Sequence, residues 1–167
     1  MDRIDSLRSD HARIRALADR LGETLARPSP PDPVQLLFLR REFGRTVTRH
    51  LKVEDWLLYP RLRSSRRPEV RAVAERLCAE VGAFEEAFGA YARRWTSLHI
   101  NSDWAGYRAD TAAMLDRLRR RMALEEDELY PLIESEPDGA GLTGMGAGPT
   151  STPWMSWTCP RPNGANA

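Results

Sequence analysis

Apolar residues recur every three or four positions through four long stretches of the chain. The first stretch, for example, places Ile14, Ala18, Leu21 and Leu25 at this spacing. Such a period puts the apolar side chains on one face of an α-helix, and none of the stretches shows the two-residue alternation of a strand. The pattern therefore predicts an all-α protein.

Short segments rich in Pro, Ser or Asn separate these stretches, at residues 28–33, 61–68 and 100–103. The third stretch between them runs from Val70 to Leu98. Four amphipathic helices of similar length with short connections favour an up-down-up-down four-helix bundle over residues 1–136. Beyond it the chain is rich in Gly and Pro with almost no charge, so we expect residues 137–167 to form a disordered tail.

The composition is that of a folded globular domain. The 167 residues are 41% hydrophobic and 29% charged, with a formal net charge of +1. This balance argues against a dedicated nucleic-acid binder. The N-terminus shows no signal peptide, and Gly and Pro interrupt the long uncharged run at residues 139–160. We therefore expect a cytoplasmic protein with neither a nucleic-acid nor a membrane partner.

Five polar residues occupy positions where the helical pattern calls for leucine. They are His11 on the first stretch, His50 and Glu54 on the second, and Arg121 and Glu125 on the fourth. Burying a charge without a partner is costly, so we expect these groups to bind one another or a cation. The spacing of four residues within each pair places both side chains on one helix face.

The second and fourth stretches also share a motif. It reads His50-x3-Glu54-x4-Tyr59-Pro60 in one and Arg121-x3-Glu125-x4-Tyr130-Pro131 in the other. The proline should kink or end each helix. This internal repeat predicts a pseudo-two-fold core in which two carboxylates and a histidine face a shared centre.

At these residues the sequence resembles the hemerythrin-like, or HHE cation-binding, family. The resemblance covers roughly residues 5–135 and rests on Asp10-His11, on His50-x3-Glu54 before Tyr59-Pro60, and on Glu125-Glu126 before Tyr130-Pro131. It implies a four-helix bundle that holds two iron atoms, usually through five histidines and two bridging carboxylates. Some members of that family carry or sense dioxygen, and others respond to iron or nitric oxide.

The chain departs from the family's ligand pattern. It has three histidines in all, and His99, beside a loop, is expected to be a surface or capping residue. The resemblance places the ligands of the third helix near Val81, which cannot bind a metal, and Glu85, which is a possible ligand. The histidine of the fourth helix is replaced by Arg121, whose permanent positive charge prevents metal binding. A full diiron site is therefore not expected.

Two interpretations of the site remain open. In the first, which we favour, no metal is bound, and Arg121 replaces the metal charge by hydrogen bonds to Glu54 or Glu125. In the second, His11, His50, Glu54 and Glu125 hold one Fe, Mn or Zn ion. Arg121 would repel such an ion unless its side chain swings away.

Each interpretation implies a different function. Without metal, we expect a regulatory or interaction protein, and with one ion, a metal sensor or storage protein. No catalytic constellation is visible, so an enzyme is not expected. A protein partner would contact the bundle surface or Trp154 and Trp157 of the tail.

Overall fold

The computed structural model describes residues 3–81 and 83–135, and all the regular structure in these two segments is helical. The elements in chain order are α1 (Arg3–Leu25), α2 (Pro33–Val53), the π-helical segment η1 (Glu54–Leu58), α3 (Tyr59–Arg63), α4 (Pro68–Val81), α5 (Phe84–Arg94), α6 (Ser97–Ser102), α7 (Trp104–Leu124), the π-helical segment η2 (Glu125–Leu129) and α8 (Tyr130–Glu134). The all-α prediction is confirmed for this part of the chain. The predicted tail, with Trp154 and Trp157, lies outside the described residues.

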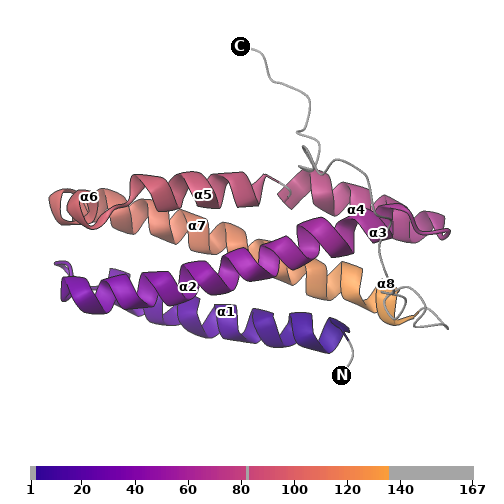
Figure 1. Ribbon diagram of the computed structural model, residues 1–167, viewed down its shortest axis with the longest axis horizontal. Helices are drawn as coiled ribbons and strands as arrows, with labels where there is room; N and C mark the ends of the chain where they lie inside the picture. The colour runs from indigo at the N-terminus through magenta and orange to yellow at the C-terminus, as the bar shows by residue number, and fades with distance from the viewer. Residues whose placement is uncertain (1–2, 82, 136–167) are drawn as a thin grey trace, which may run out of the picture.

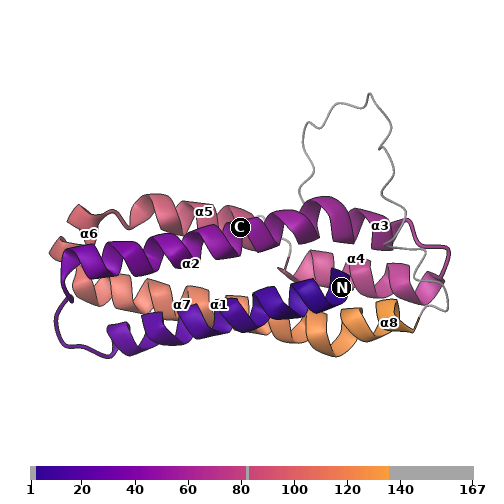
Figure 2. The same cartoon turned by 60° about the horizontal axis from the view of Figure 1, so that its bottom comes forward.

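The helices lie along one long axis and alternate in direction (Figures 1 and 2). α1 and α2 are antiparallel neighbours, joined at the end of the molecule where α6 also lies. α4 and α5 return toward that end, and α7 runs back to α8 near the start of α1. The four stretches are not the continuous helices that we predicted. η1 and η2 interrupt the second and the fourth, and the third is divided into α4, α5 and α6.

Side-chain caps fix the starts of two long helices. Asp32 accepts hydrogen bonds from the backbone N–H groups of Val34 and Gln35 at the start of α2, where Pro33 occupies the first turn. Asp103 accepts one from Gly106 at the start of α7. Asp103, the last residue of the segment at 100–103, is therefore the cap of α7.

The third apolar stripe ends earlier than the sequence predicts. Leu98, which we placed on that stripe, is 75% exposed. α5 ends at Arg94, and Thr96 caps a new helix by accepting a hydrogen bond from the His99 N–H. The helical phase is lost at this break, so a position that would face the core in a continuous helix faces solvent instead.

The core consists of two apolar clusters that follow each other along the axis. Ile14, Val47 and Leu118 belong to one cluster, and Leu7, Leu58 and Leu129 belong to the other. The five polar residues singled out in the sequence fall between these clusters on α1, on α2 and η1, and on α7 and η2, and all of them are buried. A buried polar layer therefore separates the two halves of the core.

Two helical glycines have room for a side chain. A Cβ placed at Gly22 in α1 or at Gly44 in α2 meets no atom within 4 Å. Alanine at either position is expected to raise the free energy of unfolding by about 0.5–1 kcal/mol, because it restricts the unfolded chain. Gly106→Ala is the matched control, since a Cβ there collides with the Asp103 carboxylate that caps α7. Denaturant unfolding should show a gain in stability for Gly22→Ala and Gly44→Ala and a loss for Gly106→Ala. A change of the same sign in all three variants would contradict the prediction.

Candidate metal centre

Each π-helical segment begins at a buried glutamate and is followed directly by a buried tyrosine. Glu54 with Tyr59, and Glu125 with Tyr130, are five residues apart, and all four side chains are buried. Five residues of α-helix turn a side chain by about 140°, which would separate the two groups. The wider turn of a π-helix, in which each tyrosine N–H donates to the glutamate carbonyl five residues before it, returns both to one face.

The two tyrosines bond across the centre. The hydroxyl of Tyr59 donates to Oε1 of Glu125 over 3.0 Å, and the hydroxyl of Tyr130 donates to Oε1 of Glu54 over 3.2 Å. Burial, followed by the charges of Glu54 and Glu125, raises the pKa of Tyr130 above its usual range, so its hydroxyl remains a donor. The tyrosine of each motif thus donates a hydrogen bond to the glutamate of the other motif. The two motifs meet at the shared centre that the internal repeat predicts.

His11 and His50 face each other at this centre. Their Nε2 atoms are 2.9 Å apart. Oε1 of Glu54 lies 3.2 Å from Nε2 of His50, and Oε2 of Glu125 lies 3.5 Å from Nε2 of His11. One ligand atom from each of these four buried residues lies within 4.8 Å of all the others. The structure therefore brings together the four residues that the second interpretation assigns to one ion.

A second carboxylate holds the outer nitrogen of His11. Nδ1 of His11 lies 2.7 Å from Oε1 of Glu126, whose other oxygen accepts a hydrogen bond of 2.6 Å from Arg15. A carboxylate at Nδ1 fixes the ring orientation and favours a proton on that nitrogen, so Nε2 is the ring atom that faces the centre. The helical pattern gave no sign of this role for Glu126, although its place beside Glu125 in the motif was an available signal.

A carboxylate also lies near Nδ1 of His50, but at a greater distance than the carboxylate at Nδ1 of His11. Its Nδ1 lies 3.9 Å from Oδ2 of Asp10, which is beyond hydrogen-bond range. Arg49 donates to the other oxygen of Asp10 over 2.6 Å. Asp10 therefore stands close to His50 without a direct hydrogen bond to its ring.

Arg121 contacts the carboxylate oxygens that do not face the histidines. Its Nε donates to Oε1 of Glu125 over 2.9 Å, and its Nη2 donates to Oε2 of Glu54 over 3.1 Å. Nη2 also lies 2.8 Å from Oδ1 of Asp55. The ion pairs that the first interpretation predicts are therefore present. Asp55 was not predicted as a site residue, because it lies beside the apolar stripe and not on it.

The charges around Arg121 do not cancel. Glu54, Glu125 and Asp55 outnumber the guanidinium by two negative charges. Burial alone would lower the pKa of His11, but Glu125 and Glu54 outweigh burial and raise it to about 9. Burial and the charge of Glu54 also raise the pKa of Glu125. Without a further cation, the centre makes up its missing positive charge by taking up protons.

A comparison with known protein families identifies the domain. The family described as hemerythrin HHE cation binding domain matches residues 2–133. The chain belongs to this family. No curated protein and no solved structure matches it. Within the described residues, no helix of this hemerythrin-like domain is both long and apolar enough to cross a lipid bilayer.

The donor set of this hemerythrin-like domain fits one divalent ion. Among the described residues, Oε2 of Glu125 is a buried acceptor without a hydrogen-bond partner, and it lies 3.5 Å from Nε2 of His11. A buried acceptor is normally paired, so an orphan beside three other ligand atoms suits a cation. Two imidazoles with carboxylate oxygens are ligands for Fe, Mn or Zn.

The same donor set does not fit the second metal ion that the family resemblance implies. Arg121 already binds the oxygens of Glu54 and Glu125 that a second ion would need. Glu85, half-buried on α5, is not part of the cluster of ligand atoms found among the described residues. His99 is exposed on α6, as predicted, with Nδ1 2.6 Å from the Arg94 carbonyl oxygen.

Proposed function

We propose that this hemerythrin-like domain is a four-helix bundle that binds one divalent ion of Fe, Mn or Zn. The ligands are His11, His50, Glu54 and Glu125, and the domain acts as a metal sensor or store and not as an enzyme. The observation that carries the proposal is that the two oxygens of Glu54, and likewise those of Glu125, face different partners. Each turns one oxygen toward the histidines and the other toward Arg121.

Arg121 then takes the place of a second metal ion. Its guanidinium is permanently charged and binds carboxylates through several N–H groups. The repulsion that we expected between a divalent ion and this guanidinium is offset, because Glu54 and Glu125 contact both. One guanidinium and one divalent ion also balance the charge of Glu54, Glu125 and Asp55. This proposal therefore combines the ion pairs of the first interpretation with the metal of the second.

The ligands come from three separate segments of the chain. His11 lies on α1, His50 on α2 with Glu54 at the start of η1, and Glu125 at the start of η2. A bound ion supplies a positive charge that all three segments share, so the stability of the domain depends on the metal supply. This dependence is the physical basis for a sensor, since a ligand that binds only the folded state stabilises it.

Metal titration tests the proposal. Chelator-treated protein should bind about one Zn(II) or Mn(II) per chain, and free metal at about one hundred times Kd should stabilise it by about 2.7 kcal/mol. His50→Gln should lose this effect, whereas His99→Gln, which changes an exposed histidine outside the centre, should keep it. If the wild type binds neither Zn(II) nor Mn(II), the proposal is overturned. The metal-free network of the first interpretation would then be the functional form.

Iron loading gives a second expected result. The wild-type protein should remain without the near-ultraviolet absorption bands of an iron pair after Fe(II) and air are added, because Arg121 occupies one of the two positions. Absorption spectra recorded with iron analysis check this expectation. Bands that grow with about two irons per chain would show that Arg121 leaves its carboxylates.

Glu126 should act as a positioning residue for the ion. Glu126→Gln weakens the hold on His11 Nδ1 and is expected to lower metal affinity about 10- to 100-fold. Glu128→Gln is the matched control, since this glutamate lies in the same π-helical segment and pairs with Arg76 near the surface. Competition with a chromogenic chelator measures both affinities. Equal losses in the two variants would indicate a general effect of charge and not an effect on His11.

A further inference from the structure

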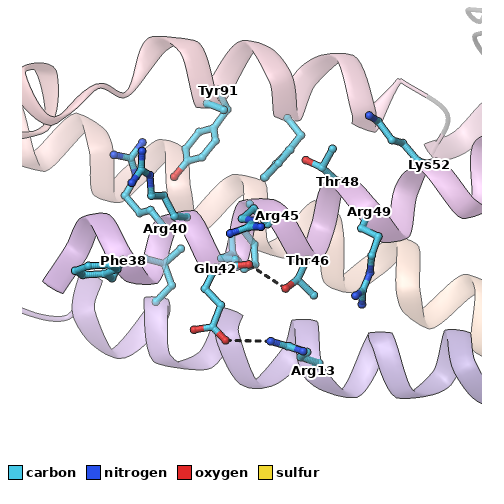
Figure 3. A pocket seen from close by; sticks show the side chains of 16 residues that line it. Arg13, Phe38, Arg40, Glu42, Arg45, Thr46, Thr48, Arg49, Lys52 and Tyr91 are labelled. Carbon is cyan, nitrogen blue, oxygen red and sulfur yellow. Dashed lines mark hydrogen bonds and ion pairs between the residues drawn. The ribbon is translucent and has the colours of Figure 1, made fainter. Parts of the chain in front are cut away.

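Cationic side chains surround a groove that the metal centre does not use. The groove has a volume of about 1030 Å³ and is centred on α2, with α1 and α5 on its flanks (Figure 3). Its positively charged lining residues are Arg13, Arg40, Arg41, Arg45, Arg49 and Lys52. We refer to it below as the α2 groove.

Most of this charge is not neutralised within the domain. Glu42 is the carboxylate in the lining, and it is already bound by Arg13 at 3.3 Å and by Arg20 at 3.9 Å. Arg41 and Arg45 are exposed one helical turn apart, and neither has a carboxylate partner within residues 3–81 and 83–135. The whole chain has a net charge of only +1, so the α2 groove is a local concentration of positive charge.

The α2 groove also offers apolar contacts. Leu21, Phe43 and Phe88 line it from the core but are themselves almost fully buried, and Gly44 leaves open space on α2 because it has no side chain. Phe38 lines the groove, and Trp56 lies outside the lining next to Lys52, whose Nζ is 5.4 Å from the centre of the indole ring. Phe38 on α2 is 68% exposed, and Trp56 on η1 is 56% exposed. Exposed aromatic residues beside uncompensated arginines are typical of protein-binding surfaces.

We propose that the α2 groove binds an acidic peptide segment of a partner protein, with apolar side chains that contact Phe38 and the hollow at Gly44. Glutamates at helical spacing on such a segment would match Arg41 and Arg45, which are four residues apart. Arg49, four residues further on, already pairs with Asp10. Charge complementarity of this kind sets partner choice and association rate.

Other segments of this chain match the groove less well. Residues 137–167 contain Asp138 as their sole acidic residue, so they lack the charge to fill it. A second copy of the chain would have to offer the acidic run of η2. There Glu125 is buried, and Glu126 and Glu128 are already paired with arginines. A flat lipid surface would not enter a concave site.

Fluorescence anisotropy tests the proposal on the full chain. The probe is a fluorescein-labelled peptide that repeats Glu and Leu at helical spacing, and its control carries Lys in place of Glu. The double variant Arg41→Glu, Arg45→Glu should weaken binding of the acidic peptide by about tenfold or more. The matched control is the double variant Arg108→Glu, Arg117→Glu on α7, outside the groove, and it should bind the acidic peptide as the wild type does. Gly44→Trp, which fills the hollow, should weaken binding without a change of charge.

The outcomes decide the proposal in either direction. It is supported if the wild type binds the Glu peptide and not the Lys peptide, and if both changes in the α2 groove weaken that binding. It is overturned if the wild type does not bind the Glu peptide, or if the α7 control loses as much affinity as the groove variant. It is also overturned if phosphatidylserine vesicles or duplex DNA bind the protein while the Glu peptide does not. Circular dichroism shows that each variant is folded.

Discussion

Replacing Arg121 with alanine is expected to lower the free energy of unfolding of the metal-free protein by about 3–5 kcal/mol. The guanidinium is 1% exposed and holds Glu54, Glu125 and Asp55 together through three contacts of 2.8–3.1 Å. Removing it leaves three carboxylates in a buried layer without their shared cation. A buried charge that loses its partner bears the full cost of desolvation, and this cost far exceeds the loss of a surface ion pair.

The neighbouring arginine on α7 provides the control. Arg120 pairs with Glu80 at the surface, so Arg120→Ala should cost less than about 1 kcal/mol. For a chain of this size, Arg121→Ala corresponds to a fall in Tm on the order of 10 °C, which differential scanning calorimetry resolves readily. Similar melting temperatures for the two variants would mean that the carboxylates around Arg121 do not depend on its charge.

Much of the fold follows directly from the helical period. Every position that the apolar stripes assign between Ile4 and Leu25 on α1, and between Tyr107 and Glu125 on α7 and η2, is buried. Leu17, Leu115 and Met122 are also buried, although the stripes do not include them. The π-helical segments could not be predicted in the same way, because an apolar period of 3.6 does not reveal a local change of turn. The one available signal was the repeated spacing of five residues between glutamate and tyrosine, followed by proline.

The candidate site was predictable as a set of residues but not as an arrangement. His11, His50, Glu54, Glu125 and Arg121 break the apolar pattern, and a buried charge must have a partner. Which oxygen of each carboxylate faces which cation depends on side-chain rotamers and on helix packing, and neither is encoded in spacing. For the same reason the two interpretations looked like alternatives, whereas the geometry lets Arg121 and one ion share the two carboxylates.

The residues that support the site were harder to find. Glu126 and Asp55 each lie next to a site residue on the edge of the apolar stripe, where a charged side chain is normally solvated. Their contacts depend on which helix packs beside them. The positive charge of the α2 groove was equally hidden, because Arg40, Arg41, Arg45 and Arg49 look like the solvated face of an ordinary amphipathic helix.

Arg121→His is expected to open a second metal position. Histidine at this place has the same spacing to Glu125 that His50 has to Glu54, and it removes the permanent charge that competes with a metal ion. The oxygens released by the guanidinium are Oε2 of Glu54, Oε1 of Glu125 and Oδ1 of Asp55. Together with the new imidazole they form a donor set of the kind that binds Fe, Mn or Zn. The number of bound ions should therefore rise from about one to about two per chain.

The variant Arg121→Gln separates the effect of the new ligand from the effect of the lost charge. Glutamine removes the guanidinium but supplies no imidazole, so it should leave the number of bound ions at about one. Calorimetric titration with Zn(II), supported by metal analysis after iron loading, measures both variants against the wild type. If Arg121→Gln gains a second ion as readily as Arg121→His, charge alone excludes metal from this position. If neither variant gains one, Arg121 does not stand where a second ion would bind.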